Sequence, residues 1–275
     1  MKLKKSYCLY EFLEFPNRAL RMGFFKIFDK ENTKFSLISR ILMTMGPIAA
    51  VVYHIGMLMS FLEIKIDTIP IILQISDRGA AIGLSTISLC KMFIMFMYRN
   101  NMAILIAELD EYFPGNLKLN PCFHNCEYKL EELYVFSRTL MRTSFFSLTS
   151  IAVLLNFMPL FQSSFEYFVM GQSFIFRLPT PSWFQWDKDS LWIFISNYIL
   201  QSYTSLHMVA FHMAGDFMLC FFLTQMRLHY EFIVTILETI DAVEAEKDKD
   251  CLKFLINYHL KLNRYVCYIR IVDCT

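Results

Sequence analysis

The stretch that decides the fold is ILMTMGPIAAVVYHIGMLMSFL, residues 41–62, which carries no charged side chain and lies between Arg40 and Glu63. As an α-helix this stretch is about 33 Å long, enough to cross the hydrocarbon core of a bilayer, which is about 30 Å thick. Two further uncharged stretches lie at residues 143–165 and 190–215, and a looser apolar stretch that contains Asp77, Arg78 and Lys91 lies at residues 68–98. The sequence therefore predicts four membrane-spanning helices.

The composition agrees with a membrane protein. The chain is 56% hydrophobic, carries 28 Phe and 17 Met, and has a net charge of only +1, which argues against nucleic-acid binding. No phosphate-binding loop, metalloprotease motif or nucleophile elbow occurs, so we expect neither an enzyme nor a cofactor. Cys122, His124 and Cys126 are close in sequence but lack a second ligand pair, so we expect no metal site. We predict an all-α integral membrane protein, a helical bundle.

The distribution of Lys and Arg predicts the orientation of this bundle. Residues 1–40 contain nine basic residues, 99–142 contain five and 227–275 contain seven. The two remaining connections, 63–67 and 166–189, contain one and two. Cytoplasmic loops retain the Lys/Arg excess. We therefore expect a multi-pass protein with a cytoplasmic N-terminus.

Amphipathic stripes predict further helices on the cytoplasmic side, at about residues 101–113, 227–242 and 251–272. Residues 217–226 are apolar on nearly all faces and follow a span that is already long enough. We therefore expect long helices that extend into the cytoplasm and pack there. All of these elements belong to one transmembrane domain, residues 1–275.

Polar residues within the spans have open or structural interpretations. Asp77 and Arg78 either line a water-filled vestibule or lie near the membrane interface, and the sequence favours neither. Lys91 lies close enough to the inner end of its span to snorkel. For His54 we expect a hydrogen bond inside the bundle. His212 and Asp216 are four residues apart on one helix face, and a structural hydrogen bond is the favoured interpretation.

Local sequence resembles the insect odorant receptor family. Residues 107–114, AELDEYFP, resemble the family's segment after its second span, and Leu178-Pro179 followed by WFQWD at 183–187 resembles its second outer loop. Gln185 stands where the family often has Pro. The positions that resemble the family's fourth-helix pattern are Asp216, Gln225, Leu228 and His229. The order and spacing of these motifs cover essentially the whole chain.

This resemblance implies a receptor of the plasma membrane that binds small volatile ligands and forms an odour-gated cation channel with a shared co-receptor. Family members have seven spans, and the seventh lines the pore. Four spans are predicted in this chain, so we expect an incomplete transmembrane domain, from a truncated product or a partial sequence.

The resemblance also implies a pocket for a small hydrophobic odorant in the outer half of the bundle, mostly apolar with a few polar groups. The residues that it assigns to this pocket are Ile72, Ile75 and Gly79 from the second span, Ser147, Ile151 and Leu154 from the third, and Asn197, Tyr198, Gln201 and Ser205 from the fourth.

Two alternatives remain open at the level of sequence. The first is a fragment of a gustatory receptor, because the diagnostic motif of that related family belongs in the seventh span. The second is a four-span transporter or scaffold protein that is complete as it stands.

Overall fold

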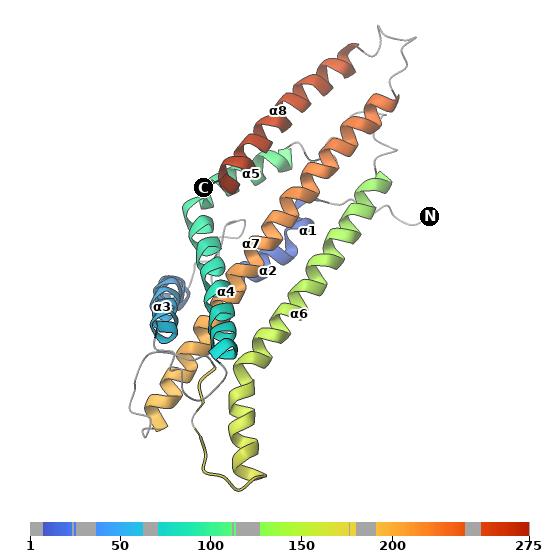
Figure 1. The fold of residues 1–275 in the computed structure, drawn as a ribbon. Coiled ribbons are helices and arrows are strands. Elements are labelled where there is room, and N and C mark those ends of the chain that lie inside the picture. The colour runs from blue at the N-terminus through green and yellow to red at the C-terminus, as the bar shows by residue number, and fades with distance from the viewer. Residues whose placement is uncertain are drawn as a thin grey trace. The chain divides into compact units, whose positions relative to one another are not determined.

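The computed structural model describes residues 8–23, 25, 37–62, 71–111, 113, 127–175, 177–179, 191–239 and 249–274. These residues form helices and connecting segments, with no strand among them. The helices, labelled in Figure 1, are α1 (Leu9–Phe12), α2 (Glu14–Met22), α3 (Leu37–Leu62), α4 (Ile71–Met97), α5 (Arg99–Glu111), α6 (Glu127–Phe168), α7 (Leu191–Thr239) and α8 (Lys249–Cys274).

Four of these helices, α3, α4, α6 and α7, are long and apolar enough to cross a membrane. Each contains most or all of one predicted span. The helices predicted after the second and fourth spans also have counterparts, because α5 covers 99–111 and α8 covers 249–274. The segment of α6 before residue 143 was left unassigned in the sequence and is helical from Glu127.

The largest difference from the prediction concerns α7. The sequence predicts a span at 190–215 and a separate helix at 227–242, but the structure has one helix of 49 residues, uninterrupted in Figure 1. At a rise of about 1.5 Å per residue it is about 74 Å long, more than twice the hydrocarbon thickness of a bilayer. No proline lies between the two predicted segments, so nothing in the backbone forces an end.

The chain forms two compact units, and the long helices contribute to both. Unit 1 comprises Met1–Asn17, Phe96–Thr143 and Asp216–Thr275. Unit 2 comprises Arg18–Met95 and Ser144–Gly215. Unit 1 therefore contains the helices predicted to be cytoplasmic, whereas unit 2 contains most of the predicted spans.

Unit 1 has an aromatic core. The Phe12 ring lies 6.1 Å from the Phe113 ring and 5.0 Å from the Tyr134 ring, both edge to face. This geometry brings the N-terminal helix α1 against the end of α5 and the start of α6. An ion pair between Glu14 and Arg138, 3.1 Å long, joins the same two regions at the surface.

The second half of α7 packs against α8 in the same unit. Phe232 and Tyr258 have ring centroids 5.6 Å apart, and both side chains are buried. The Tyr258 hydroxyl is also hydrogen-bonded to Nδ1 of His229, which is buried as well. The sequence predicts an apolar stripe on α8 that includes Leu255 and Ile256, and this is partly correct, since Leu255 is buried but Ile256 is exposed.

Unit 2 is held together by small residues and by contacts between long apolar helices. Gly46 of α3 lies against the ring of His207 on α7, and a Cβ placed on Gly46 would come within 2.4 Å of that ring. The Tyr203 hydroxyl donates to the carbonyl of Leu42, 3.0 Å away, which also joins α7 to α3. On α4, the aliphatic chain of Lys91 covers Gly215. Small residues let membrane helices approach this closely.

Candidate functional site

A polar contact between α6 and α7, two long helices of unit 2, centres on Asn156 of α6. The Nδ2 group of this residue donates to the carbonyl of Ala152 at 2.7 Å and to the Ser205 hydroxyl at 3.2 Å. The main-chain carbonyl of Asn156 accepts a hydrogen bond from the Tyr198 hydroxyl. Asn156 is only 4% exposed, so these contacts are shielded from solvent. We call Asn156, Tyr198 and Ser205 the Asn156 cluster.

One atom of this cluster has no partner. The Oδ1 atom of Asn156 is buried and makes no hydrogen bond within the part of the chain that the structure describes. The amide orientation is fixed by its neighbour, because the Ala152 carbonyl can only accept and therefore selects the NH₂ end of the amide. The cluster thus presents an unsatisfied acceptor inside an apolar bundle.

The sequence-predicted residues of α7 lie at this contact or next to it. Tyr198 and Ser205 belong to the Asn156 cluster, and Gln201, which lies between them at helical spacing, is buried. Asn197 is half-buried. Residues at spacings of three, four and seven share a helix face, which explains why these polar side chains gather along one side of α7.

The sequence-predicted residues of α6 lie elsewhere. Ser147, Ile151 and Leu154 are exposed, with 52% and 67% of the latter two side chains accessible. The face of α6 that meets α7 contains Thr149, Ala152 and Asn156 instead; the Thr149 hydroxyl lies 4.0 Å from the sulfur of Met213. The structure therefore does not bring these three predicted residues together with the Asn156 cluster.

The predicted residues of α4 are also separate from the cluster. Ile75 is 44% exposed, and within the described residues no heavy atom outside the helix's own backbone lies within 4 Å of a Cβ placed on Gly79. The side chain of Ile72 lies outside the described residues. The assignment of these α4 residues to a ligand site remains a prediction.

Two residues important to unit 2 were not predicted for the site. Asn156 lies in the predicted third span but is not among the residues predicted for the ligand site. His207 is 2% exposed, with ring centroids 5.8 Å from Tyr203 and 5.0 Å from Phe211, and neither ring nitrogen has a hydrogen-bond partner among the described residues. An asparagine in an apolar span is a usable signal, because a buried amide requires partners.

The polar residues of α3 and α4 have structural roles. His54 shares a 2.6 Å hydrogen bond with the Ser85 hydroxyl, which confirms the prediction that His54 is hydrogen-bonded inside the bundle. Arg78 donates to the carbonyl of Ser60, two residues before α3 ends. This contact places the Arg78 side chain beside the last turn of α3, which supports the interpretation that Arg78 lies near the membrane interface. The side chain of Asp77 lies outside the described residues.

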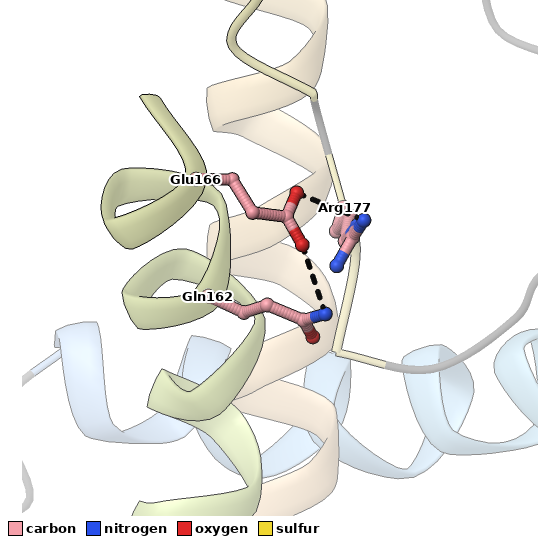
Figure 2. A network of polar contacts seen from close by, with 3 residues as sticks. All are labelled: Gln162, Glu166 and Arg177. Carbon is pink, nitrogen blue, oxygen red and sulfur yellow. Dashed lines mark hydrogen bonds and ion pairs between the residues drawn. The ribbon is translucent and has the colours of Figure 1, made fainter. Parts of the chain in front are cut away.

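A second polar network closes the end of α6 (Figure 2). The Glu166 carboxylate accepts a 3.1 Å hydrogen bond from Gln162 and forms a 3.0 Å ion pair with Arg177, which lies on the segment after the helix. Gly171, with φ +64°, lies where the chain leaves α6, a conformation that glycine adopts without strain. The network therefore holds the connecting segment against the helix.

No group of three His, Cys, Asp or Glu side chains within the described ranges could hold a metal ion. The cluster of Cys122, His124 and Cys126 lies outside those ranges.

Comparison with known proteins identifies the family. The family model described as 7tm odorant receptor matches residues 71–272. Two isoforms of a Drosophila melanogaster protein provisionally named odorant receptor 69a are similar: isoform B is 24% identical over 83% of this chain and isoform A is 22% identical over 81%. The chain spans 57% and 56% of the length of these curated relatives.

The fold has a solved counterpart. The insect olfactory receptor OR5 from Machilis hrabei superposes with a TM-score of 0.69 at 12% identity, covering 96% of this chain and 65% of that one. At this level of identity the likeness concerns the fold, and it confirms the predicted all-helical membrane protein. The family is one of receptors rather than enzymes, as predicted, and the match disfavours the gustatory alternative. The chain belongs to the 7tm odorant receptor family.

Proposed function

We propose that this chain is a subunit of an odour-gated cation channel and that unit 2 recognises the odorant. The observation that carries the proposal is the Asn156 cluster, in which a buried asparagine meets two half-buried polar side chains between two apolar helices. Pockets for small ligands are mostly apolar, with a few polar groups that fix orientation. Membership of the odorant receptor family supplies the ligand class, small hydrophobic volatiles.

The proposed ligand site combines the Asn156 cluster with the predicted residues of α7, of which Tyr198, Gln201 and Ser205 lie at or next to the cluster. Recognition would rest on shape, dispersion and one or two hydrogen bonds, because no charged side chain takes part in these contacts. Gating would be a population shift, in which the odorant binds the open state more tightly than the closed state.

The partner in this proposal is the odorant receptor co-receptor, which forms a hetero-oligomer with the chain in the plasma membrane. We assign ligand recognition, and not the pore, to unit 2. The region shared with this chain covers only 57% and 56% of the curated relatives. We therefore propose the contribution to the pore for the whole receptor and not for unit 2.

We also propose that the N-terminus is cytoplasmic. The basic residues flank the spans asymmetrically, with nine in residues 1–40 and two in residues 166–189. The N-terminal helix α1 packs in unit 1 against α5 and the start of α6, which supports a common side for all three. Glycosylation sequons inserted before Cys8 and near Gly171 test this orientation. The proposal fails if the N-terminal sequon is the one that becomes glycosylated.

Co-expression with a co-receptor and recording of whole-cell currents test the proposed function. We expect volatile compounds to evoke a cation current only when both chains are present. We expect Asn156→Leu to change the order of potency among the volatiles, whereas Phe161→Leu, at a position 74% exposed on α6, leaves that order unchanged. Binding of odorants without any co-receptor-dependent current would contradict the channel role while preserving recognition.

A further inference from the structure

The unsatisfied Oδ1 atom of Asn156 carries information about the chemistry of the ligand. Buried side-chain oxygens in proteins almost always accept a hydrogen bond, because an unmade bond costs the full desolvation of the group. Within the described residues no donor of the Asn156 cluster pairs with Oδ1, and the Ser205 hydroxyl accepts from Nδ2 instead. The Tyr198 hydroxyl donates to the main-chain carbonyl of Asn156, and the Asn156 amide hydrogens donate to Ala152 and Ser205.

Further unsatisfied groups lie on the same two helices. Ser163 is seven residues beyond Asn156 on α6, about two turns along the same face, and its hydroxyl is buried without a partner in the described chain. The hydroxyl of Ser202 on α7 is likewise buried and unpartnered among those residues. Neutral polar groups are thus repeated along this part of unit 2, where a ligand could satisfy them.

The chemistry of these groups selects the ligand class. An amide oxygen is neutral and accepts, so it requires a donor. A carboxylic acid or an amine is charged in water at neutral pH, so entering an apolar bundle costs it either the desolvation of that charge or the free energy of neutralising it first. An ether, ester or ketone has no donor and would leave Oδ1 unpaired. An alcohol or a phenol supplies one neutral donor, and its oxygen can also accept from a serine hydroxyl.

Building on the proposed function, we propose that Asn156 Oδ1 accepts a hydrogen bond from the hydroxyl group of an alcohol or phenol odorant, and thereby makes this receptor selective for hydroxylated volatiles. Asn156 is then a specificity-determining residue. Ser205 and the Ala152 carbonyl position its amide through Nδ2, whereas Tyr198 is hydrogen-bonded to the main chain of Asn156.

Isomeric ligand pairs test this proposal directly. The probes are 1-octanol with 1-methoxyheptane, and 2-phenylethanol with benzyl methyl ether; each pair has one formula and differs in the donor. Binding to the purified chain in lipid nanodiscs is measured against empty nanodiscs, which corrects for partition into lipid. In each pair we expect the alcohol to bind about tenfold more tightly than the ether. A ratio of this size is what one buried hydrogen bond contributes.

Two variants test whether the preference for the alcohol over the ether depends on Oδ1 of Asn156. Asn156→Leu removes the acceptor and should reduce the ratio to about one, the value expected when no hydrogen bond distinguishes the isomers. Ser205→Ala removes a partner of Nδ2 but leaves Oδ1, so the preference should persist. If Asn156→Leu does not fold, the ratio of alcohol to ether affinity in the wild-type chain still tests the proposed selectivity for hydroxyl groups.

The outcomes separate this inference from the proposed function. If alcohol and ether bind the wild-type chain equally, the hydroxyl selectivity is wrong and odorant recognition stands. A preference that survives Asn156→Leu overturns the assignment to Oδ1. If no compound binds above the empty nanodisc, both the inference and the proposed recognition role of unit 2 are overturned.

Discussion

Unit 1 and unit 2 bury their residues by different means. Unit 1 has a core of large side chains, among them Phe12, Phe221 and Phe232, all at most 2% exposed. Unit 2 leaves large apolar side chains such as Phe161 and Leu154 exposed and joins its helices through Gly46, small residues and hydrogen bonds. In the proposed orientation unit 1 lies in water, which drives apolar burial, and unit 2 lies in lipid, which removes that driving force. The contrast is one of degree, because Phe136 of unit 1 is 62% exposed and Phe211 of unit 2 is 1% exposed.

The largest expected effect comes from removing a ring from the core of unit 1. Phe232→Ala deletes a side chain that is 2% exposed and lies against Tyr258. We expect a loss of about 3–5 kcal/mol in the free energy of unfolding, because the deletion leaves a cavity. Thermal unfolding of the purified chain in detergent, followed by circular dichroism, measures the change.

Phe161→Ala in unit 2 is the matched control, because this side chain is 74% exposed. This variant should lower the free energy of unfolding little, because the Phe161 ring contacts lipid or detergent in the folded chain and would do the same in the unfolded chain. Equal losses for the two variants would mean that the two units do not differ in the way their cores are built.

A smaller effect is expected at the closest approach in unit 2. In Gly46→Ala the new Cβ would lie 2.4 Å from Cε1 and 2.5 Å from Nε2 of His207. His207 is buried between neighbouring rings, so α3 and α7 must separate. We expect a loss of about 1–3 kcal/mol, typical of overpacking. The same unfolding measurement detects it.

Two further variants isolate this contact. Adding His207→Ala to Gly46→Ala should recover part of the loss, because the ring that clashes is gone. Gly79→Ala is the matched control, since its Cβ would meet no atom within 4 Å and alanine favours a helix. Additive losses in the double variant would show that Gly46 and His207 are not coupled.

The sequence predicts the helices of unit 2 better than their contacts. Arg40 and Glu63 bracket an uncharged stretch, and α3 ends at Leu62 as this pattern predicts. The sequence predicts a span that ends at Gly215 in a helix that extends further, and α7 continues for 23 residues beyond Asp216 to Thr239, because one exposed carboxylate does not break a helix. A charged residue at the end of an apolar stretch therefore need not mark the end of the helix.

The side chains of the candidate site were harder to predict. A lipid-facing helix is apolar on all sides, so periodicity does not identify the face that meets a neighbour. Ser147, Ile151 and Leu154 of α6 are therefore exposed in the structure, whereas Asn156 meets Tyr198 and Ser205. On α7 the polar residues themselves mark the inner face, and Tyr198, Gln201 and Ser205 lie there or next to it.

The smallest effect is expected at the Glu166–Arg177 pair (Figure 2), which holds the segment after α6 in place. Arg177 is 32% exposed along its side chain, and exposed ion pairs contribute at most about 1 kcal/mol. Arg177→Gln should therefore leave global unfolding nearly unchanged. It should favour local opening of this segment, which raises the rate of chymotrypsin cleavage at the exposed Phe174 by about two- to fivefold.

The matched control is Arg227→Gln in unit 1. Arg227 pairs with Glu231 at 3.6 Å within a single helix, so losing the pair releases no connecting segment. Cleavage at Phe174 should not change in this variant. High salt should raise the cleavage rate of the wild-type chain toward that of Arg177→Gln, because salt screens the pair. A cleavage rate that neither Arg177→Gln nor salt alters would mean that Gly171 and the backbone hydrogen bond from Gln172 to Glu166 suffice to hold this segment, without the ion pair.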